Sequence, residues 1–341
     1  MAAALRSAPE LATAEVPRDA VSLVVIDRAR ERIELAAFRA LPELLDAGDL
    51  VVVNDAATLP ASLRGTTAAG APFELRLSAP VDGSRLYGVV FGPGDHRTRT
   101  EHRAAPPSIA IGEVVRIGGL SATVAALAGR RIELVARASE DRLWQALYAA
   151  GRPVQYAHRR ELLPLWSVQT AYAARPWSVE MPSAGRPLTW EVLLGLRRRG
   201  IAIARLTHAA GLSSTGDDAL DRALPWPERY ELPRATVDAI GEARARGGHV
   251  IAIGTTVVRA LEAAADGGEL RAGSGVATLR LDAAYRPRVV DGIVSGLHAP
   301  GESHFELLRA FAPRDRLVRA IELAAAHGLS SHELGDSCLI V

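Results

Sequence analysis

The chain has 341 residues, 48% of them hydrophobic and 23% charged, so it can bury a sizeable core without disulfides or metal ions. A prior of about 150 residues per domain predicts roughly two domains. The formal net charge of +1 gives no strong overall field toward nucleic acid or membrane. All 40 basic residues are arginine, which excludes a Walker-type phosphate loop, a pyridoxal-phosphate Schiff base and a lysine aldolase.

The single cysteine and the N-terminal segment exclude further classes. Cys338 has no second cysteine for a disulfide within the chain or a thiolate zinc cage, and its apolar surroundings predict a small buried side chain. The apolar run near the N-terminus is broken by Arg6 and Pro9, too early for a signal peptide. No run approaches the roughly 20 apolar residues of a membrane span, so we expect a cytoplasmic protein.

The first third of the chain changes character once. Residues 21–27 and 50–54 are short β-branched runs typical of buried strands, and residues 41–47 between them favour a helix that ends at Gly48. Residues 61–138 form a series of alternating segments bounded by Gly, Pro and Asp. Short strands at this spacing predict a small antiparallel barrel or sandwich.

The rest of the chain alternates between helix and strand. Thr189 is placed to cap a helix that ends at Gly200, and a strand over 201–207 follows. A helix over 234–246 leads to a strand over 249–253 and a further helix. The predicted fold class is therefore α/β with two domains. Residues 1–60 and 139–341 are expected to form a discontinuous α/β catalytic domain, and residues 61–138 an inserted small antiparallel β-barrel.

The segment HVIAIGTTVVRALE, residues 249–262, is the clearest local feature. A buried strand leads through a glycine turn into a helix, whose free N–H groups and dipole favour an electron-rich ligand. Ligands of open α/β sheets gather at the carboxyl ends of strands. The alternative is that Thr255 only caps the helix and Arg259 is solvated, and the pattern leaves both interpretations open.

A second polar group follows in residues 295–313, where His298, Glu302, His304 and Glu306 stand close together. Imidazole and carboxylate can bind zinc or iron, but the spacing matches no zinc motif. Ser303 and Glu306 have the spacing of a capping box, which accounts for them without a function. His298 precedes that helix and is the better candidate for catalysis.

His208 ends the strand over 201–207 and is a third candidate. Its ordinary pKa near neutrality suits general acid–base work, although a histidine in such a place is often structural. Arginine clusters at 130–131, 159–160 and 197–199 could contact phosphates, or could lie on solvated faces.

These segments, in this order, resemble the S-adenosylmethionine:tRNA ribosyltransferase-isomerase family of queuosine biosynthesis. The stretches that carry the resemblance are AGDLVVVND, LPASLRG, VQTAYA, MPSAG, VSGLHAP, LLRAFAP, GDSCLIV and, as the longest, ELPRATVDAIGEARARGGHVIAIGTTVVRALE. The family fold is an α/β domain interrupted by a β-barrel. The family reaction transfers the ribosyl part of S-adenosylmethionine to the aminomethyl group of a 7-deazaguanine in tRNA. It releases adenine and methionine.

The resemblance implies S-adenosylmethionine as co-substrate, tRNA as partner, no metal and a monomer. One base can start the elimination of adenine, and a polar shell must stabilise the charges that develop. These needs favour His298, His208 and Glu228 as catalytic residues. The predicted residues for binding the co-substrate are listed together: Gly254, Thr255, Thr256, Arg259 and Asn54.

Several loops depart from the family pattern. Residues 55–57 replace an Asn-Thr-Arg sequence, Arg186 stands where the family has a histidine, Ala210 and Leu212 replace glycines, and Glu302 replaces a serine. The departures keep open a second interpretation, a relative that uses S-adenosylmethionine on a small-molecule acceptor such as a nucleoside. A third is an RNA-binding protein without catalysis, which the retained histidines and glycine turn disfavour.

Overall fold

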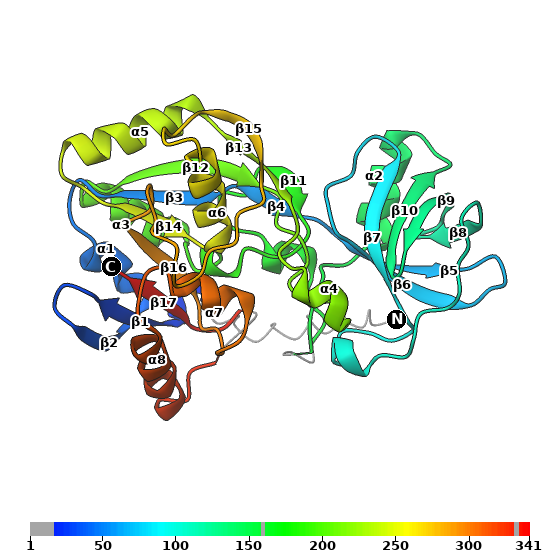
Figure 1. Cartoon of the computed structure of the whole chain (residues 1–341), viewed down its shortest axis with the longest axis horizontal. Helices are drawn as coiled ribbons and strands as arrows, with labels where there is room; N and C mark the ends of the chain where they lie inside the picture. The colour runs from blue at the N-terminus through cyan, green and yellow to red at the C-terminus, as the bar shows by residue number, and fades with distance from the viewer. Residues whose placement is uncertain (1–16, 158–160, 331–333) are drawn as a thin grey trace, which may run out of the picture.

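The computed structural model describes residues 17–157, 161–330 and 334–341. These residues form two lobes, one built on a nine-stranded sheet with helices and one on a closed antiparallel barrel of six strands (Figure 1). The predicted α/β class with an antiparallel β-barrel is confirmed.

Four neighbouring parallel strands form the middle of the large sheet. The sheet order is β15-β13-β12-β3-β14-β16-β17-β1-β2, and β12, β3, β14 and β16 run parallel to one another. Their carboxyl ends therefore meet at one edge, and the antiparallel β13 begins at that same edge. The strands are β1 (Ser22–Asp27), β2 (Arg32–Ala37), β3 (Leu50–Asn54), β12 (Ala202–His208), β13 (Glu228–Leu232), β14 (Val250–Ile253), β15 (Gly273–Ala277), β16 (Gly292–Gly296) and β17 (Ser337–Ile340).

Helices cover both faces of this sheet, which explains the continuous apolar runs of β3 and β14. On one face Leu50 and Val52 pack in a core with α5, α6 and α8, and on the other Val51 and Val53 pack in a core with α1 and α3. The helices are α1 (Leu41–Leu44), α2 (Glu140–Ala150), α3 (Trp190–Arg198), α4 (Asp218–Arg222), α5 (Arg234–Ala245), α6 (Thr255–Ala264), α7 (Ser303–Leu308) and α8 (Arg314–Ala326).

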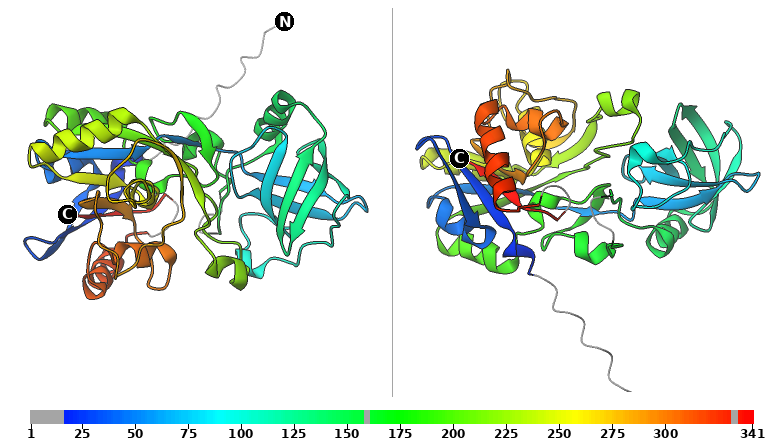
Figure 2. Two further views of the ribbon diagram at one scale, coloured as in Figure 1. Left: turned by 45° about the horizontal axis from the view of Figure 1, so that its top comes forward. Right: turned by 90° about the horizontal axis from the view of Figure 1, so that it is seen from below.

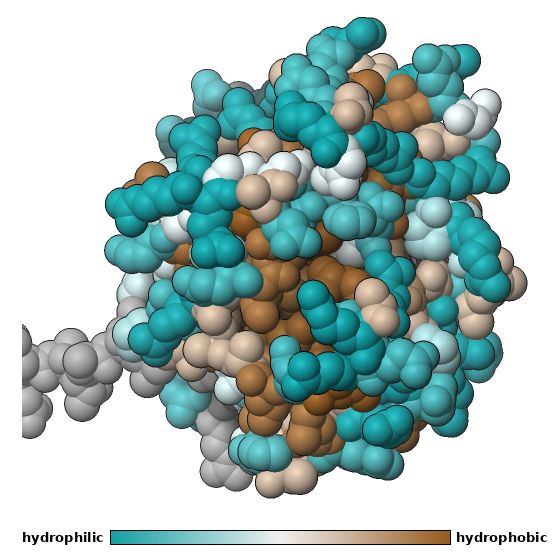
Figure 3. All heavy atoms as spheres, turned by 90° about the vertical axis from the view of Figure 1, so that its left-hand side faces the viewer, coloured by the Kyte–Doolittle hydropathy of each residue, from teal (hydrophilic) through white to brown (hydrophobic). Residues whose placement is uncertain are grey.

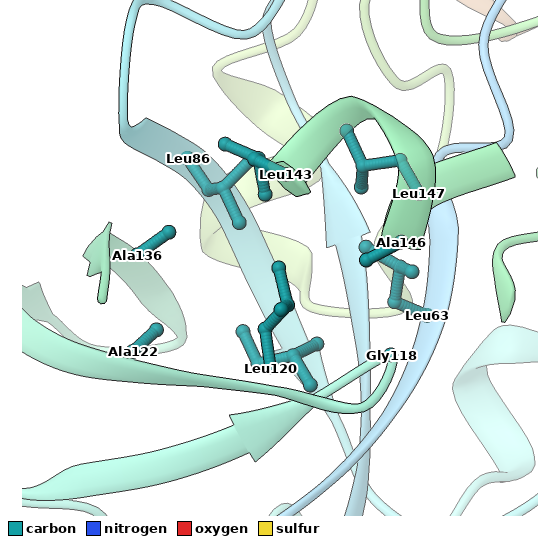
Figure 4. A pocket seen from close by; sticks show the side chains of 10 residues that line it. Leu63, Leu86, Gly118, Leu120, Ala122, Ala136, Leu143, Ala146 and Leu147 are labelled. Atoms are coloured by element: carbon teal, nitrogen blue, oxygen red, sulfur yellow. The ribbon is translucent and has the colours of Figure 1, made fainter. Parts of the chain in front are cut away.

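The barrel is a packed core rather than a container. Its closed order is β10-β7-β6-β5-β8-β9, with strands β5 (Ser62–Thr66), β6 (Pro72–Leu77), β7 (Arg85–Phe91), β8 (Val114–Ile117), β9 (Leu120–Ala128) and β10 (Arg131–Ala136). Leu143 and Leu147 of α2 pack into this core. The gap that remains beside α2 is lined by leucine, isoleucine, alanine and glycine and holds only about 10 Å³, the space of one water (Figure 4).

Chain segments connect the two lobes on more than one path (Figure 2). The short strands β4 (Ala56–Thr58) and β11 (Arg175–Ser178) pair in parallel, and β4 follows directly after β3. The loop after β12 also belongs to both lobes, because it starts at His208 of the sheet and places Leu212 in the barrel core. The carboxyl edge of the sheet is thereby tied to the barrel.

The far side of the sheet lobe is mostly hydrophilic, with hydrophobic side chains gathered in the middle of that face (Figure 3). Within residues 17–157, 161–330 and 334–341, no helix is long and apolar enough to cross a membrane.

Candidate active site

The carboxyl edge of the large sheet brings together all the residues that the sequence predicted for the site. Asn54 ends β3, His208 ends β12, Gly254 follows β14 and His298 follows β16. Glu228 begins β13 beside the end of β12, because these two strands are antiparallel. Five segments far apart in the sequence therefore supply polar side chains to one place, as expected for a ligand site in an open α/β sheet.

His208, Glu228 and Arg259 form a buried cluster at this edge. The His208 Nε2 and Glu228 Oε2 atoms lie 3.4 Å apart but are not aligned as a hydrogen bond. The Arg259 guanidinium forms an ion pair with the same Glu228 carboxylate, and the backbone N–H of Gly211 donates to its other oxygen at 2.5 Å. Two side chains of opposite charge thus lie against a fully buried imidazole.

Burial decides the protonation of this cluster. Removal from water, together with the nearby positive charge of Arg259, lowers the pKa of His208 to about 3. Burial raises the pKa of Glu228, while Arg259 and the Gly211 N–H oppose that rise. His208 is therefore neutral at physiological pH and can accept a proton. Both of its ring nitrogens lack a hydrogen-bond partner among the described residues.

The start of α6 differs from the simple cap that the sequence left open. Gly254 is the N-cap residue, with a φ of 90° that side chains rarely adopt, and Thr255 is already the first helical residue. No side chain caps this end, so the interpretation of Thr255 as a plain cap is wrong. Arg259 is only 5% exposed and donates to the carbonyls of Ala277 and Leu279, so it is not solvated either.

Asn54 fixes the position of the His208 backbone. Its side-chain amide donates to the His208 carbonyl at 3.0 Å, and its side-chain oxygen accepts from the His208 N–H at 2.9 Å. The same nitrogen lies 3.4 Å from the Thr256 hydroxyl, and Asn54 is 2% exposed. Asn54 therefore joins the ends of β3 and β12 to the first turn of α6.

His298 lies on the more open side of the site, with 16% of its side chain exposed. Its ring stacks on that of His304, with centroids 4.7 Å apart, and its Nδ1 lies 3.5 Å from a Glu302 carboxylate oxygen. Burial, the neighbouring His298 and, more weakly, Arg259 lower the pKa of His304 to about 3. The histidine pair is thus close enough to the Arg259 cluster to be affected by its charge.

The predicted capping box is wrong. Helix α7 has Glu302 as its N-cap residue with no side-chain cap bond, and the Glu306 carboxylate accepts from Arg309 at 2.5 Å. Glu302 instead accepts from the backbone N–H of Ala299 at 3.1 Å and stabilises the turn after β16. Over the described ranges, no three His, Cys, Asp or Glu side chains gather as a metal ion would need.

Comparison with known proteins identifies the family. Residues 7–340 match the family of queuosine biosynthesis proteins. The chain belongs to this family. It is 36% identical to the S-adenosylmethionine:tRNA ribosyltransferase-isomerase of Sorangium cellulosum, over 97% of this chain and 96% of that protein. It is 33% identical to the enzyme of that name from Trichlorobacter lovleyi, over 95% of this chain and 94% of the relative.

A solved structure agrees with this assignment. The crystal structure of S-adenosylmethionine tRNA ribosyltransferase from Thermotoga maritima covers 99% of both chains at 25% identity, with a TM-score of 0.53. The S-adenosylmethionine-using family predicted from the sequence segments is therefore confirmed.

The positions at which this family member departs from the pattern have structural roles here. Asp55 accepts from the Thr207 hydroxyl at 2.6 Å, and Arg186 is buried and donates to the Ser167 carbonyl at 2.8 Å. Leu212 fills the barrel core where the resemblance predicts glycine. The changed residues thus make internal contacts that tie neighbouring segments together.

The arginine clusters do not form one surface. Residues 197–199 precede β12 and lie at the opposite edge of the sheet from His208. Arg130 and Arg131 lie on the barrel, over the rings of Phe91 and Trp226. The cluster at 159–160 lies outside the described residues.

Sequence reasoning missed the group that fixes the loop after His208. The Glu180 carboxylate accepts from the Tyr156 hydroxyl and, at 2.6 Å, from the backbone N–H of Ser213. Burial raises the pKa of Glu180. The loop is thus held by Glu228 at Gly211 and by Glu180 at Ser213. Nothing in the local pattern around Glu180 distinguishes it from a surface glutamate.

Proposed function

We propose that this protein transfers the ribosyl part of S-adenosylmethionine to the 7-aminomethyl-7-deazaguanine base of a tRNA and isomerises it, releasing adenine and methionine. The proposal is supported by the near full-length similarity to enzymes that carry this name. It is further supported by the cluster of His208, Glu228 and Arg259 at the carboxyl edge of the sheet. That similarity favours tRNA over a small-molecule acceptor.

The site offers the acid–base groups that this reaction needs. The sulfonium of S-adenosylmethionine acidifies the adjacent 5′ protons, so one base can start the elimination of adenine. His298 is the catalytic group we place nearest the substrate, because its side chain is on the open side of the site. His208, kept neutral by burial, and Glu228 supply a proton acceptor and a negative charge behind it.

The first turn of α6 is the proposed binding site for the electron-rich part of S-adenosylmethionine. Gly254 brings the backbone close without a side chain, and the free N–H groups of Thr255 and Thr256 point out of the helix start. The bonds of Arg259 to Glu228 and to carbonyls support a positioning role, in which it holds the Glu228 carboxylate. Asn54 would act likewise, by holding the His208 backbone and the Thr256 hydroxyl.

The test is to incubate the purified protein with S-adenosylmethionine and tRNA that carries the aminomethyl-deazaguanine, and to measure free adenine and methionine. We expect both products in equal amounts and only when that tRNA is present. Adenine released equally without tRNA would contradict the proposed acceptor. No adenine under any condition, from protein that is folded, would contradict the reaction.

A further inference from the structure

A second cavity lies on the barrel side of the molecule. It has a volume of about 300 Å³ and is lined by residues of β5 and β6, of the loop after β7 and of the segment after α2. This volume is at the lower end of the range for small-molecule sites. Unlike the gap beneath α2, its lining carries charged groups: Arg64, Arg76, Arg152, Glu74, Asp95 and His96.

Two buried arginines share one carboxylate in the wall of this cavity. Glu74 pairs with Arg76 Nε at 2.7 Å and with Arg103 Nη1, and it also accepts from the Ser62 hydroxyl at 2.8 Å. The side chains of Arg76 and Arg103 are 3% and 2% exposed. Burial alone would raise the pKa of Glu74, but the two arginines outweigh it and hold the pKa below its usual value. The group therefore carries two positive charges and one negative charge.

Both buried guanidiniums have unused hydrogen-bond donors. Arg76 Nη1 and Arg103 Nε have no partner in the part of the chain that the structure describes. A buried donor on a charged group is costly when it is unpaired, so an anion that accepts from it would be stabilised. Gly94 forms the cavity wall in front of Arg103, where a Cβ would lie 3.0 Å from Arg103 Nε. The absent side chain thus leaves space beside that donor.

The rim of the cavity adds to the positive charge. Arg64 and Arg152 are exposed and line the cavity. The Asp95 carboxylate accepts from the backbone N–H of Arg97 at 2.9 Å. With Arg103, four arginines surround this space against the two carboxylates of Glu74 and Asp95. The barrel as a whole is basic, since residues 61–138 hold ten arginines and six acidic residues in a chain of net charge +1.

We propose that this cavity binds a phosphate group, held by the buried Arg76 and Arg103 and by Arg64 and Arg152 at its rim. Guanidinium groups are the side chains best suited to phosphate oxygens, because their N–H donors match two oxygens at once. The phosphate belongs either to the backbone of the tRNA, in which case the inference rests on the proposed function, or to a free phosphate monoester.

The experiment compares two double variants of the full chain. Arg64→Gln/Arg152→Gln removes both exposed arginines of the rim. Arg85→Gln/Arg137→Gln removes two barrel arginines that do not line the cavity, so it changes the net charge equally. Each protein is titrated with unmodified tRNA transcript at several salt concentrations, and its melting temperature is measured with increasing inorganic phosphate. Because all four side chains are on the surface, both variants are expected to fold.

If the cavity binds the tRNA backbone, the rim variant binds tRNA more weakly than the control, and its salt dependence falls by about 0.7 to 0.9 per lost phosphate contact. If it binds a free phosphate, inorganic phosphate raises the melting temperature of the wild type and the control but not of the rim variant. Equal behaviour of the two variants in both assays would overturn the proposal. These assays need no turnover, so tRNA binding without adenine release would contradict the proposed function alone.

Discussion

Replacing Arg259 with leucine would remove the only guanidinium described beside the Glu228 carboxylate. Arg259 forms an ion pair with Glu228 and donates to the carbonyls of Ala277 at 3.0 Å and Leu279 at 3.3 Å. Leucine keeps much of the volume of the side chain but none of these bonds. Glu228, whose side chain is 10% exposed, would be left as a buried charge without a counter-ion.

Breaking a buried pair by removing one partner costs about 3 to 5 kcal/mol in the free energy of unfolding. The cost in this protein also depends on pH. Without Arg259, the pKa of Glu228, already raised by burial, rises further. The carboxyl group then takes up a proton as the pH falls, so the loss of stability is largest above neutrality and becomes smaller in acid.

The assay is urea unfolding followed by tryptophan fluorescence at pH 8 and pH 5.5. The control is Arg234→Leu, which removes an exposed ion pair with Asp238 on α5 and should change the free energy by less than about 0.5 kcal/mol. A loss below about 1 kcal/mol for Arg259→Leu at pH 8 would refute the reasoning. So would a loss that is the same at both pH values.

Three further predictions concern the same edge of the sheet. His298→Ala should lower kcat by about 10²- to 10⁴-fold and change KM much less, since its role is in proton transfer; equal changes in both would count against that role. His208→Gln should remove about 1.4 kcal/mol of stability loss per pH unit between pH 6 and 4. The wild-type pKa is lowered from 6.5 to about 3, so the folded state loses stability as pH falls through that window; an unchanged slope in acid titration would contradict this. Gly254→Ala should cost about 1 to 2 kcal/mol, because its φ of 90° disfavours a side chain, and calorimetry should show weaker binding of S-adenosylmethionine; normal stability and binding would argue against it.

The sequence predicted the architecture well because its signals are local. The β-branched run of β3 and the polar residue that ends it are enough to place Asn54 at a strand end. Thr189 caps α3 as predicted, by accepting from the Val192 N–H at 3.4 Å. The boundaries of the inserted domain, residues 61–138, stay a prediction, although the six barrel strands lie between Ser62 and Ala136.

The contacts within the site could not be predicted in the same way, because they join distant segments. Arg259 is an arginine in an exposed-looking helix pattern, and only Glu228, 31 residues earlier, explains its burial. Asn54 contacts His208 across 154 residues. The capping-box prediction failed because Glu306 pairs with Arg309 three residues later, and the motif cannot distinguish these partners.

The most direct test of the account follows the ribose rather than the adenine. The protein is incubated with S-adenosylmethionine labelled in its ribose and with tRNA that carries the aminomethyl-deazaguanine, and the tRNA is then digested to nucleosides. The account predicts one labelled, modified deazaguanosine for each adenine released, and loss of both signals in a His298→Ala variant that still binds S-adenosylmethionine. Adenine release with no label in the tRNA would contradict ribosyl transfer as the function of this site.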